Sequence, residues 1–220
     1  MQNKLSPRYV AVIGMFTALA FVSVIATEWI PKVSGFLSYE PKDALIVMAG
    51  FIYGPVACLL ISLLTSFLEL VTISSTGLYG FLMNVVSTLA FTVPAAFLYH
   101  KSRTKRNALL GLGLGVASMA AIMVLWNYVI TPFYMGVPRE QVAGMLVPVF
   151  LPFNLVKGGI NAGLTLLLYK PVVGALRKAG LAQPSSTGSD KRVFNPGFTL
   201  FAVAVLVTFV LLFLTMIGVL

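Results

Sequence analysis

The chain has 220 residues, of which 59% are hydrophobic and only 10% are charged. Several uninterrupted apolar stretches reach the roughly 20 residues that a helix needs to cross a bilayer. This composition excludes a soluble globular domain and predicts an all-α integral membrane protein folded as one compact bundle. The formal net charge of +9 would suit a nucleic-acid ligand, but its distribution along the chain indicates membrane orientation instead. No nucleic-acid partner is therefore predicted.

The apolar stretches predict a six-helix transmembrane bundle followed by a seventh, C-terminal transmembrane helix. We expect the spans at 8–27, 42–53, 56–72, 80–100, 107–130, 148–176 and 198–219. The second stretch is short, so it is either partly re-entrant or continues across a kink at Gly54 into the third. A short helix is expected from Arg139. The chain then divides into a substrate-binding domain at 1–180, a polar linker at 181–197 and the additional helix at 198–220.

Lysine and arginine are distributed unequally between the two sets of loops, which predicts the orientation of the chain. With a cytoplasmic N-terminus, eleven of the fifteen basic residues face inward: Lys4, Arg8, Lys101, Arg103, Lys105, Arg106, Lys170, Arg177, Lys178, Lys191 and Arg192. Only Lys32, Lys42 and Arg139 then lie in outer loops. Lys157 is left near the outer membrane boundary. We therefore predict a multi-pass protein with its N-terminus in the cytoplasm.

The segment 151–163, LPFNLVKGGINAG, carries three polar side chains inside an apolar stretch. Asn154, Lys157 and Asn161 are spaced i, i+3 and i+7, so they lie on one face of a helix. A lysine at membrane depth is costly and indicates a functional site by default. The alternative is that the lysine snorkels to the interface while the asparagines hold helices together. We favour a ligand-binding face inside the bundle.

The predicted topology places further polar residues on the same outer side as this face. They are Glu40, Asp43, Asn84 and Asn127, with Glu69 close by. Aromatic residues at a membrane interface usually form a belt, but here they are interleaved with amides and a lysine. We therefore expect one outward-facing pocket for a flat molecule with polar edges.

Motifs for catalysis, metal binding and nucleotide binding are missing from the sequence. The single histidine, His100, borders a basic loop, and no nucleophile is paired with a base. Gly111, Gly113 and Gly115 lie at the start of an apolar stretch, so they predict close helix packing. We expect no enzymatic activity, no metal and no cofactor of the chain's own. Transport driven by ATP would then require partner subunits.

Two segments resemble a known transporter family. FLSYEPKD at 36–43 and PFNLVKGGIN at 152–161 are similar to the riboflavin-binding members of the substrate-binding (S) components of energy-coupling factor (ECF) vitamin transporters. The resemblance covers residues 1–180. It implies that the chain, in the cell membrane of a prokaryote, captures riboflavin outside. A transmembrane coupling protein (EcfT) and two ATPases (EcfA and EcfA') would then drive release of the vitamin inside.

The resemblance also implies which residues bind and which dock. Together with the topology it gives these substrate-binding candidates: Leu37, Tyr39, Glu40, Asp43, Asn84, Asn127, Asn154 and Lys157. The family docks its coupling protein through small residues on the first helix, and the matching positions are Ala11, Gly14 and Ala18. The seventh span departs from the six-helix pattern of the family. It lacks charges and amides, so it is predicted to be dispensable for binding.

Other functions stay open at this point. Spacing alone does not choose riboflavin over thiamine or a pterin. A self-sufficient carrier of a small polar aromatic metabolite, coupled to protons or sodium, would use Glu69 and Lys157 as coupling groups, although no internal repeat is evident. An integral-membrane enzyme or scaffold is disfavoured by the missing catalytic groups. Dependence on ATPase partners would separate the vitamin transporter from the ion-coupled carrier.

Overall fold

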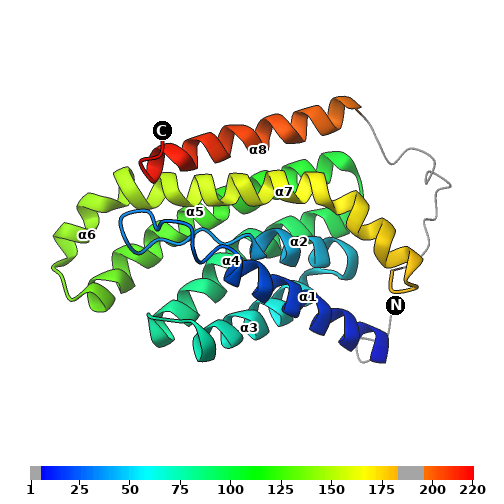
Figure 1. Cartoon of the computed structure of the whole chain (residues 1–220), viewed down its shortest axis with the longest axis horizontal. Helices are drawn as coiled ribbons and strands as arrows, with labels where there is room; N and C mark the ends of the chain where they lie inside the picture. The colour runs from blue at the N-terminus through cyan, green and yellow to red at the C-terminus, as the bar shows by residue number, and fades with distance from the viewer. Residues whose placement is uncertain (1–5, 183–195) are drawn as a thin grey trace.

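The computed structural model describes residues 6–182 and 196–220. Within this part of the chain the fold is helical, apart from an isolated bridge between Val33 and Leu37. The elements are α1 (Pro7–Ile25), α2 (Lys42–Tyr53), α3 (Pro55–Thr72), α4 (Gly77–Lys101), α5 (Lys105–Met135), α6 (Arg139–Met145), the π-helical turn η1 (Leu146–Phe150), α7 (Leu151–Lys178) and α8 (Pro196–Met216) (Figure 1). The predicted all-α membrane fold is confirmed, including the seventh helix and the short helix from Arg139. The predicted linker falls almost entirely outside the described residues.

Local capping signals define two of the helix starts. Ser6 accepts a hydrogen bond from the backbone N–H of Tyr9 at 3.3 Å, and Pro7 takes the first helical position of α1. Thr104 caps α5 in the same way by accepting from the backbone N–H of Asn107 at 3.2 Å. α1 and α5 begin at the same end of the bundle (Figure 1), and basic residues lie at both starts.

α2 and α3 form an antiparallel hairpin. After Tyr53 the chain passes through Gly54 at a φ of 94°, a backbone conformation that favours glycine, and Pro55 starts α3. The reversal brings Lys42, the first residue of α2, beside Glu69 near the end of α3. The predicted alternative of one helix kinked at Gly54 is therefore wrong.

Two of the three glycines at the start of α5 allow it to pack closely on α4. A Cβ atom at Gly111 would lie 2.8 Å from the carbonyl oxygen of Ala95, and one at Gly115 would overlap the backbone of Phe91. A Cβ atom at Gly113 would meet nothing within 4 Å, so this glycine faces away. The predicted close packing is confirmed for Gly111 and Gly115.

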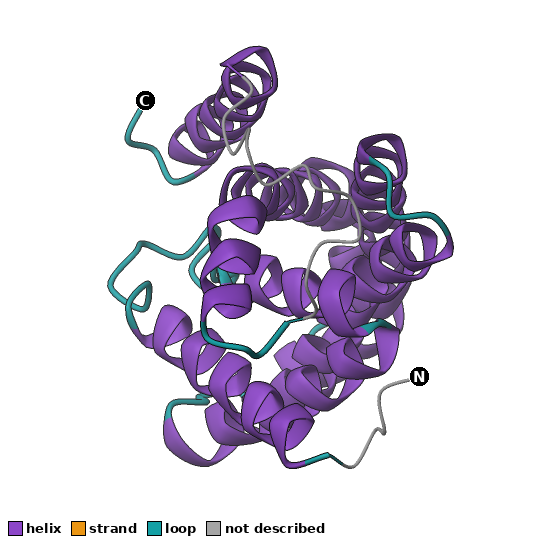
Figure 2. Cartoon of the chain, turned by 90° about the vertical axis from the view of Figure 1, so that its right-hand side faces the viewer, coloured by secondary structure: helices purple, strands orange, loops and turns teal. Residues whose placement is uncertain are grey.

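The short α2 lies in the interior and α8 lies on the outside. Nine of the twelve residues of α2 are buried, and its apolar side chains join the main core of the bundle. α8 runs along α7 at the edge of the molecule, away from α1, as the two views show (Figures 1 and 2). Within residues 6–182 and 196–220, six helical segments are long and apolar enough to cross a membrane, and α2 is not among them.

Candidate functional site

A cavity opens at the end of the bundle opposite to the basic loops. The ends of α1, α3 and α5 and the starts of α4 and α7 meet there, together with the segment 26–41 between α1 and α2. The cavity and the solvent-open space at its mouth together hold about 820 Å³ free of protein atoms, of which about 100 Å³ can take the centres of water-sized molecules. Its position agrees with the predicted convergence of polar residues on one side of the membrane.

Six of the eight predicted substrate-binding residues lie in the cavity wall. They are Leu37, Glu40, Asn84, Asn127, Asn154 and Lys157. Tyr39 and Asp43 are not wall residues. The ring of Tyr39 packs on Phe213, with 5.6 Å between centroids, and Asp43 is fully buried, where its Oδ1 accepts a hydrogen bond from Thr88 Oγ1 at 2.6 Å. Direct binding of a substrate by any of the eight residues stays a prediction.

The cavity floor rests on buried ion pairs that centre on Lys42. Its Nζ lies 2.7 Å from both carboxylate oxygens of Glu69 and 3.2 Å from Oε2 of Glu40. Asn84 Nδ2 donates a further hydrogen bond to Glu69 at 2.6 Å. The prediction that Lys42 lies in an outer loop is wrong, because the hairpin turns its side chain inward and leaves it 0% exposed. A buried charge needs partners of this kind.

Lys157 joins the same group of ion pairs from α7. Its Nζ donates to Glu40 Oε2 at 2.9 Å and lies 4.0 Å from Asp43 Oδ2. Lys157 is therefore paired inside the bundle and does not snorkel to the interface. Because it also lines the cavity, its ammonium group is placed to meet a polar ligand.

Glu40 lies in the segment before α2 and connects the two lysines. Burial disfavours its carboxylate, but the nearby ammonium groups of Lys157 and Lys42 outweigh this effect and lower the Glu40 pKa to about 2. A carboxylate whose pKa is lowered on folding stabilises the fold above its ordinary pKa, and this contribution is lost as the pH falls through about 2. The Glu40 carboxylate therefore stays ionised at neutral pH beside Lys157.

Asn161 shares a helix face with Lys157 but has a different role. Its Nδ2 donates to the carbonyl oxygens of Glu40 and Lys157, each at 3.1 Å, and its Oδ1 accepts from the backbone N–H of Ala44 at 3.2 Å. It does not line the cavity. Asn161 thus holds the backbone that carries Glu40, whereas Asn154 and Lys157 face the cavity itself.

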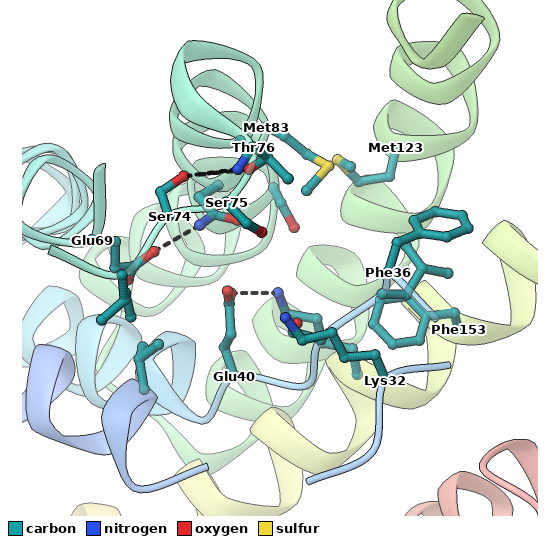
Figure 3. A pocket seen from close by; sticks show the side chains of 18 of the residues that line it. Lys32, Phe36, Glu40, Glu69, Ser74, Ser75, Thr76, Met83, Met123 and Phe153 are labelled. Carbon is teal, nitrogen blue, oxygen red and sulfur yellow. Dashed lines mark hydrogen bonds and ion pairs between the residues drawn. The ribbon is translucent and has the colours of Figure 1, made fainter. Parts of the chain in front are cut away.

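Several wall residues lie outside the set of eight predicted substrate-binding residues, although Phe36 and Phe153 belong to the aromatic residues expected near the pocket. Figure 3 shows Glu69 with the loop residues Ser74 to Thr76 on one side of the cavity and Phe36 with Phe153 on the other. Met83 and Met123 also line the wall. The signal for Glu69 was present, since it is an acidic residue within an otherwise apolar helix. The hydroxyl-bearing loop gave no comparable signal.

The segment 26–41 reaches the cavity through a tight turn. The backbone groups of Val33 and Leu37 exchange two hydrogen bonds at 3.0 Å, and of the three residues between them Ser34 and Gly35 have φ values of 52° and 81°. Two successive positive φ values are typical of type I′ turns. The turn places Leu37 against the cavity and leads directly into Glu40.

Comparisons of the sequence and of the structure with known proteins point to the same family. The model of the ECF transporter substrate-specific component matches residues 8–169. The chain therefore belongs to this family of transporter components. A solved structure of the S component of a bacterial ECF transporter superposes with a TM-score of 0.66 at 26% identity, covering 80% of this chain and 99% of that one.

Two curated relatives cover the same part of the chain. The riboflavin transporter FmnP of Bacillus subtilis (strain 168) is 27% identical over 180 residues, which is 76% of this chain and 95% of the relative. The riboflavin transporter RibU of Staphylococcus aureus (strain TCH60) is 24% identical over 172 residues, which is 76% of this chain and 90% of the relative. The predicted family is thereby confirmed, and α8 lies beyond the residues that the family model matches.

Proposed function

We propose that this chain is the riboflavin-binding subunit of an ECF transporter and has no enzymatic activity of its own. The observation that carries the proposal is the cavity, which combines buried amides and a lysine with aromatic and methionine side chains in a member of the S-component family. Two relatives, aligned over 95% and 90% of their own length, are named riboflavin transporters. The chain would thus capture the vitamin and leave the energy source to other subunits.

The chemistry of the wall suits a flavin. An isoalloxazine ring has two large faces and one edge that alternates hydrogen-bond donors and acceptors. Phe36, Phe153 and Met123 offer apolar contacts to the faces, and the amides of Asn127 and Asn154 retain donor and acceptor capacity for the edge. The charged and hydroxyl groups of the wall would pair with the ribityl hydroxyls.

The distribution of charge supports an outward-facing cavity. The basic loop between α4 and α5 and the basic end of α7 lie at the end opposite to the cavity, and basic loops face the cytoplasm. This orientation would place the N-terminus in the cytoplasm of a prokaryotic cell. There the chain would meet a transmembrane coupling protein and two ATPases, EcfT, EcfA and EcfA' in the family.

An uptake assay tests the division of labour. Proteoliposomes or cells that contain this chain with its ECF partners are expected to accumulate labelled riboflavin only when ATP is available. The chain alone is expected to bind riboflavin without accumulating it, and ionophores that dissipate proton and sodium gradients should not abolish ATP-driven uptake. Gradient-driven accumulation by the chain alone would instead identify a self-sufficient secondary carrier.

Docking through α1 gives a second expected result. Ala11, Gly14 and Ala18 are all exposed on α1, and a Cβ atom at Gly14 would meet nothing within 4 Å. A leucine there is tolerated by the chain itself but would prevent close approach of another helix. Gly14→Leu and Ala18→Leu should therefore impair uptake by at least about 10-fold while riboflavin binding stays within about 2-fold of wild type.

The matched control for these variants is Val10→Leu, a conservative change at another exposed position of α1. Uptake and binding by this control should both match wild type. A docking role would be rejected if Gly14→Leu and Ala18→Leu lost binding and uptake equally while remaining folded.

A further inference from the structure

α8 packs on α7 through a pair of glycines. Gly159 and Gly163 are one turn apart on α7, and a Cβ atom at Gly163 would lie 3.0 Å from the backbone of Leu206. A Cβ atom at Gly159 would overlap the ring of Phe209. Small residues spaced by four allow such close helix contacts in membranes. The position of α8 on the bundle is therefore specified by residues of both helices.

The buried face of α8 continues beyond this contact to the substrate-side segment 26–41. Ala202, Leu206, Phe209 and Phe213 follow a helical spacing of four, three and four residues, and Phe213 is buried. The ring of Phe213 lies 5.6 Å from the ring of Tyr39, tilted by 54°. An aromatic pair in this geometry contributes more than its buried area alone.

Tyr39 lies between two residues of that segment that line the cavity. Its neighbours Ser38 and Glu40 both line the cavity, whereas Tyr39 itself points away from it toward α8. Glu40 is held on the other side by Lys157 and by Asn161 of α7. The end of the segment 26–41, which carries Glu40, is thus held by α7 through polar contacts and by α8 through an aromatic contact.

We propose that Phe213 of α8 acts through Tyr39 as a positioning residue for the vitamin site, so that the additional helix is part of the binding apparatus. This proposal rests on the proposed riboflavin binding. It replaces the expectation from the sequence that the seventh span is dispensable, which rested on the preceding linker and on the absence of charges and amides in the span.

The hydroxyl group of Tyr39 provides a way to separate positioning from direct binding. It is buried and has no hydrogen-bond partner in the described part of the chain. Tyr39→Phe keeps the ring and removes only this hydroxyl, so riboflavin affinity should stay within about 2-fold of wild type. A large loss of affinity in Tyr39→Phe would mean that the hydroxyl binds the vitamin directly, which would overturn the proposed role.

The principal test compares riboflavin dissociation constants and dissociation rates in the full chain. Phe213→Ala and Tyr39→Ala should each weaken binding by about 3- to 10-fold, mainly through faster dissociation. The double variant should be no more than about 2-fold weaker than the weaker single variant, because both changes remove the same contact. Phe213→Leu, which keeps apolar volume, should recover part of the loss. The control Leu212→Ala lies one residue away on the exposed face of α8 and should match wild type.

Amide hydrogen exchange without ligand gives an independent readout. At a temperature well below the unfolding midpoint, Phe213→Ala should accelerate exchange within 26–41 while leaving α2 and α4 unchanged. Unchanged exchange in this segment, or unchanged affinity in Phe213→Ala, would overturn the proposal. If the wild-type chain binds no riboflavin, the proposed function fails, and the exchange comparison still decides whether α8 holds the segment.

Discussion

Replacing Lys42 by methionine is expected to lower the free energy of unfolding by about 3–5 kcal/mol. Lys42 is fully buried and contacts both oxygens of Glu69 at 2.7 Å as well as Glu40 at 3.2 Å. Methionine fills a similar volume, so the loss comes from stranding the Glu69 carboxylate in the interior. The measurement is the unfolding of the detergent-solubilised protein by heat or denaturant.

Two further variants make this expectation specific. Lys42→Met combined with Glu69→Gln should recover a substantial part of the stability, because the neutral amide no longer needs a cation and can still accept from Asn84. Lys32→Met is the matched control. Lys32 forms a partly exposed i,i+4 pair with Glu28 at 3.2 Å, which contributes about 0–1 kcal/mol. Equal, small effects of Lys42→Met and Lys32→Met would contradict the buried network.

Replacing Lys157 by methionine is expected to weaken riboflavin binding by about 10- to 150-fold. Lys157 lines the cavity, and a hydrogen bond from a charged donor to a buried ligand group is among the stronger polar contacts. Asn154→Ala should weaken binding by about 5- to 150-fold, since it leaves a polar edge of the ligand unpaired. Dissociation constants from fluorescence titration check both values.

The free energy of unfolding should distinguish the cavity-wall variant Lys157→Met from Lys42→Met, which removes the centre of the ion-pair network. Lys157→Met should destabilise the chain less than Lys42→Met, because Glu40 retains Lys42 at 3.2 Å. Asn161→Ala should weaken riboflavin binding less than Lys157→Met or Asn154→Ala does. Asn161 is not in the cavity wall, and its side chain bonds only to the backbone of 40–44 and of its own helix. A binding defect that is largest in Asn161→Ala and absent in Lys157→Met would contradict this assignment of the cavity.

The helices could be predicted from the sequence because apolar stretches of membrane length and their breaks are local signals. The stripe of Asn154, Lys157 and Asn161 was visible for the same reason, since it depends only on helical spacing. The sequence did not show that Asn154 and Lys157 line the cavity while Asn161 binds the backbone. Whether Asn161 meets a ligand or the backbone of Glu40 depends on how a segment more than a hundred residues away packs against α7.

The wrong placement of Lys42 and the orientation of the Tyr39 side chain away from the cavity have the same origin. Lys42 was predicted to lie in an outer loop because it stands at the boundary between the loop after the first apolar stretch and the second stretch, and the hairpin that pairs it with Glu69 is a tertiary feature. Tyr39 was grouped with the binding residues because it lies between Leu37 and Glu40. The turn at Ser34 and Gly35 determines which side chains of this segment reach the cavity, and the contact with Phe213 turns Tyr39 toward α8.

Equilibrium binding of a vitamin panel to the purified wild-type chain tests the central claim most directly. Riboflavin should show saturable quenching of its fluorescence as protein is added, because the ring would be buried against Phe36, Phe153 and the polar wall. Thiamine and biotin should neither bind tightly nor displace it. The absence of saturable riboflavin quenching, with tight binding of thiamine or biotin instead, would contradict the assignment of riboflavin as the substrate.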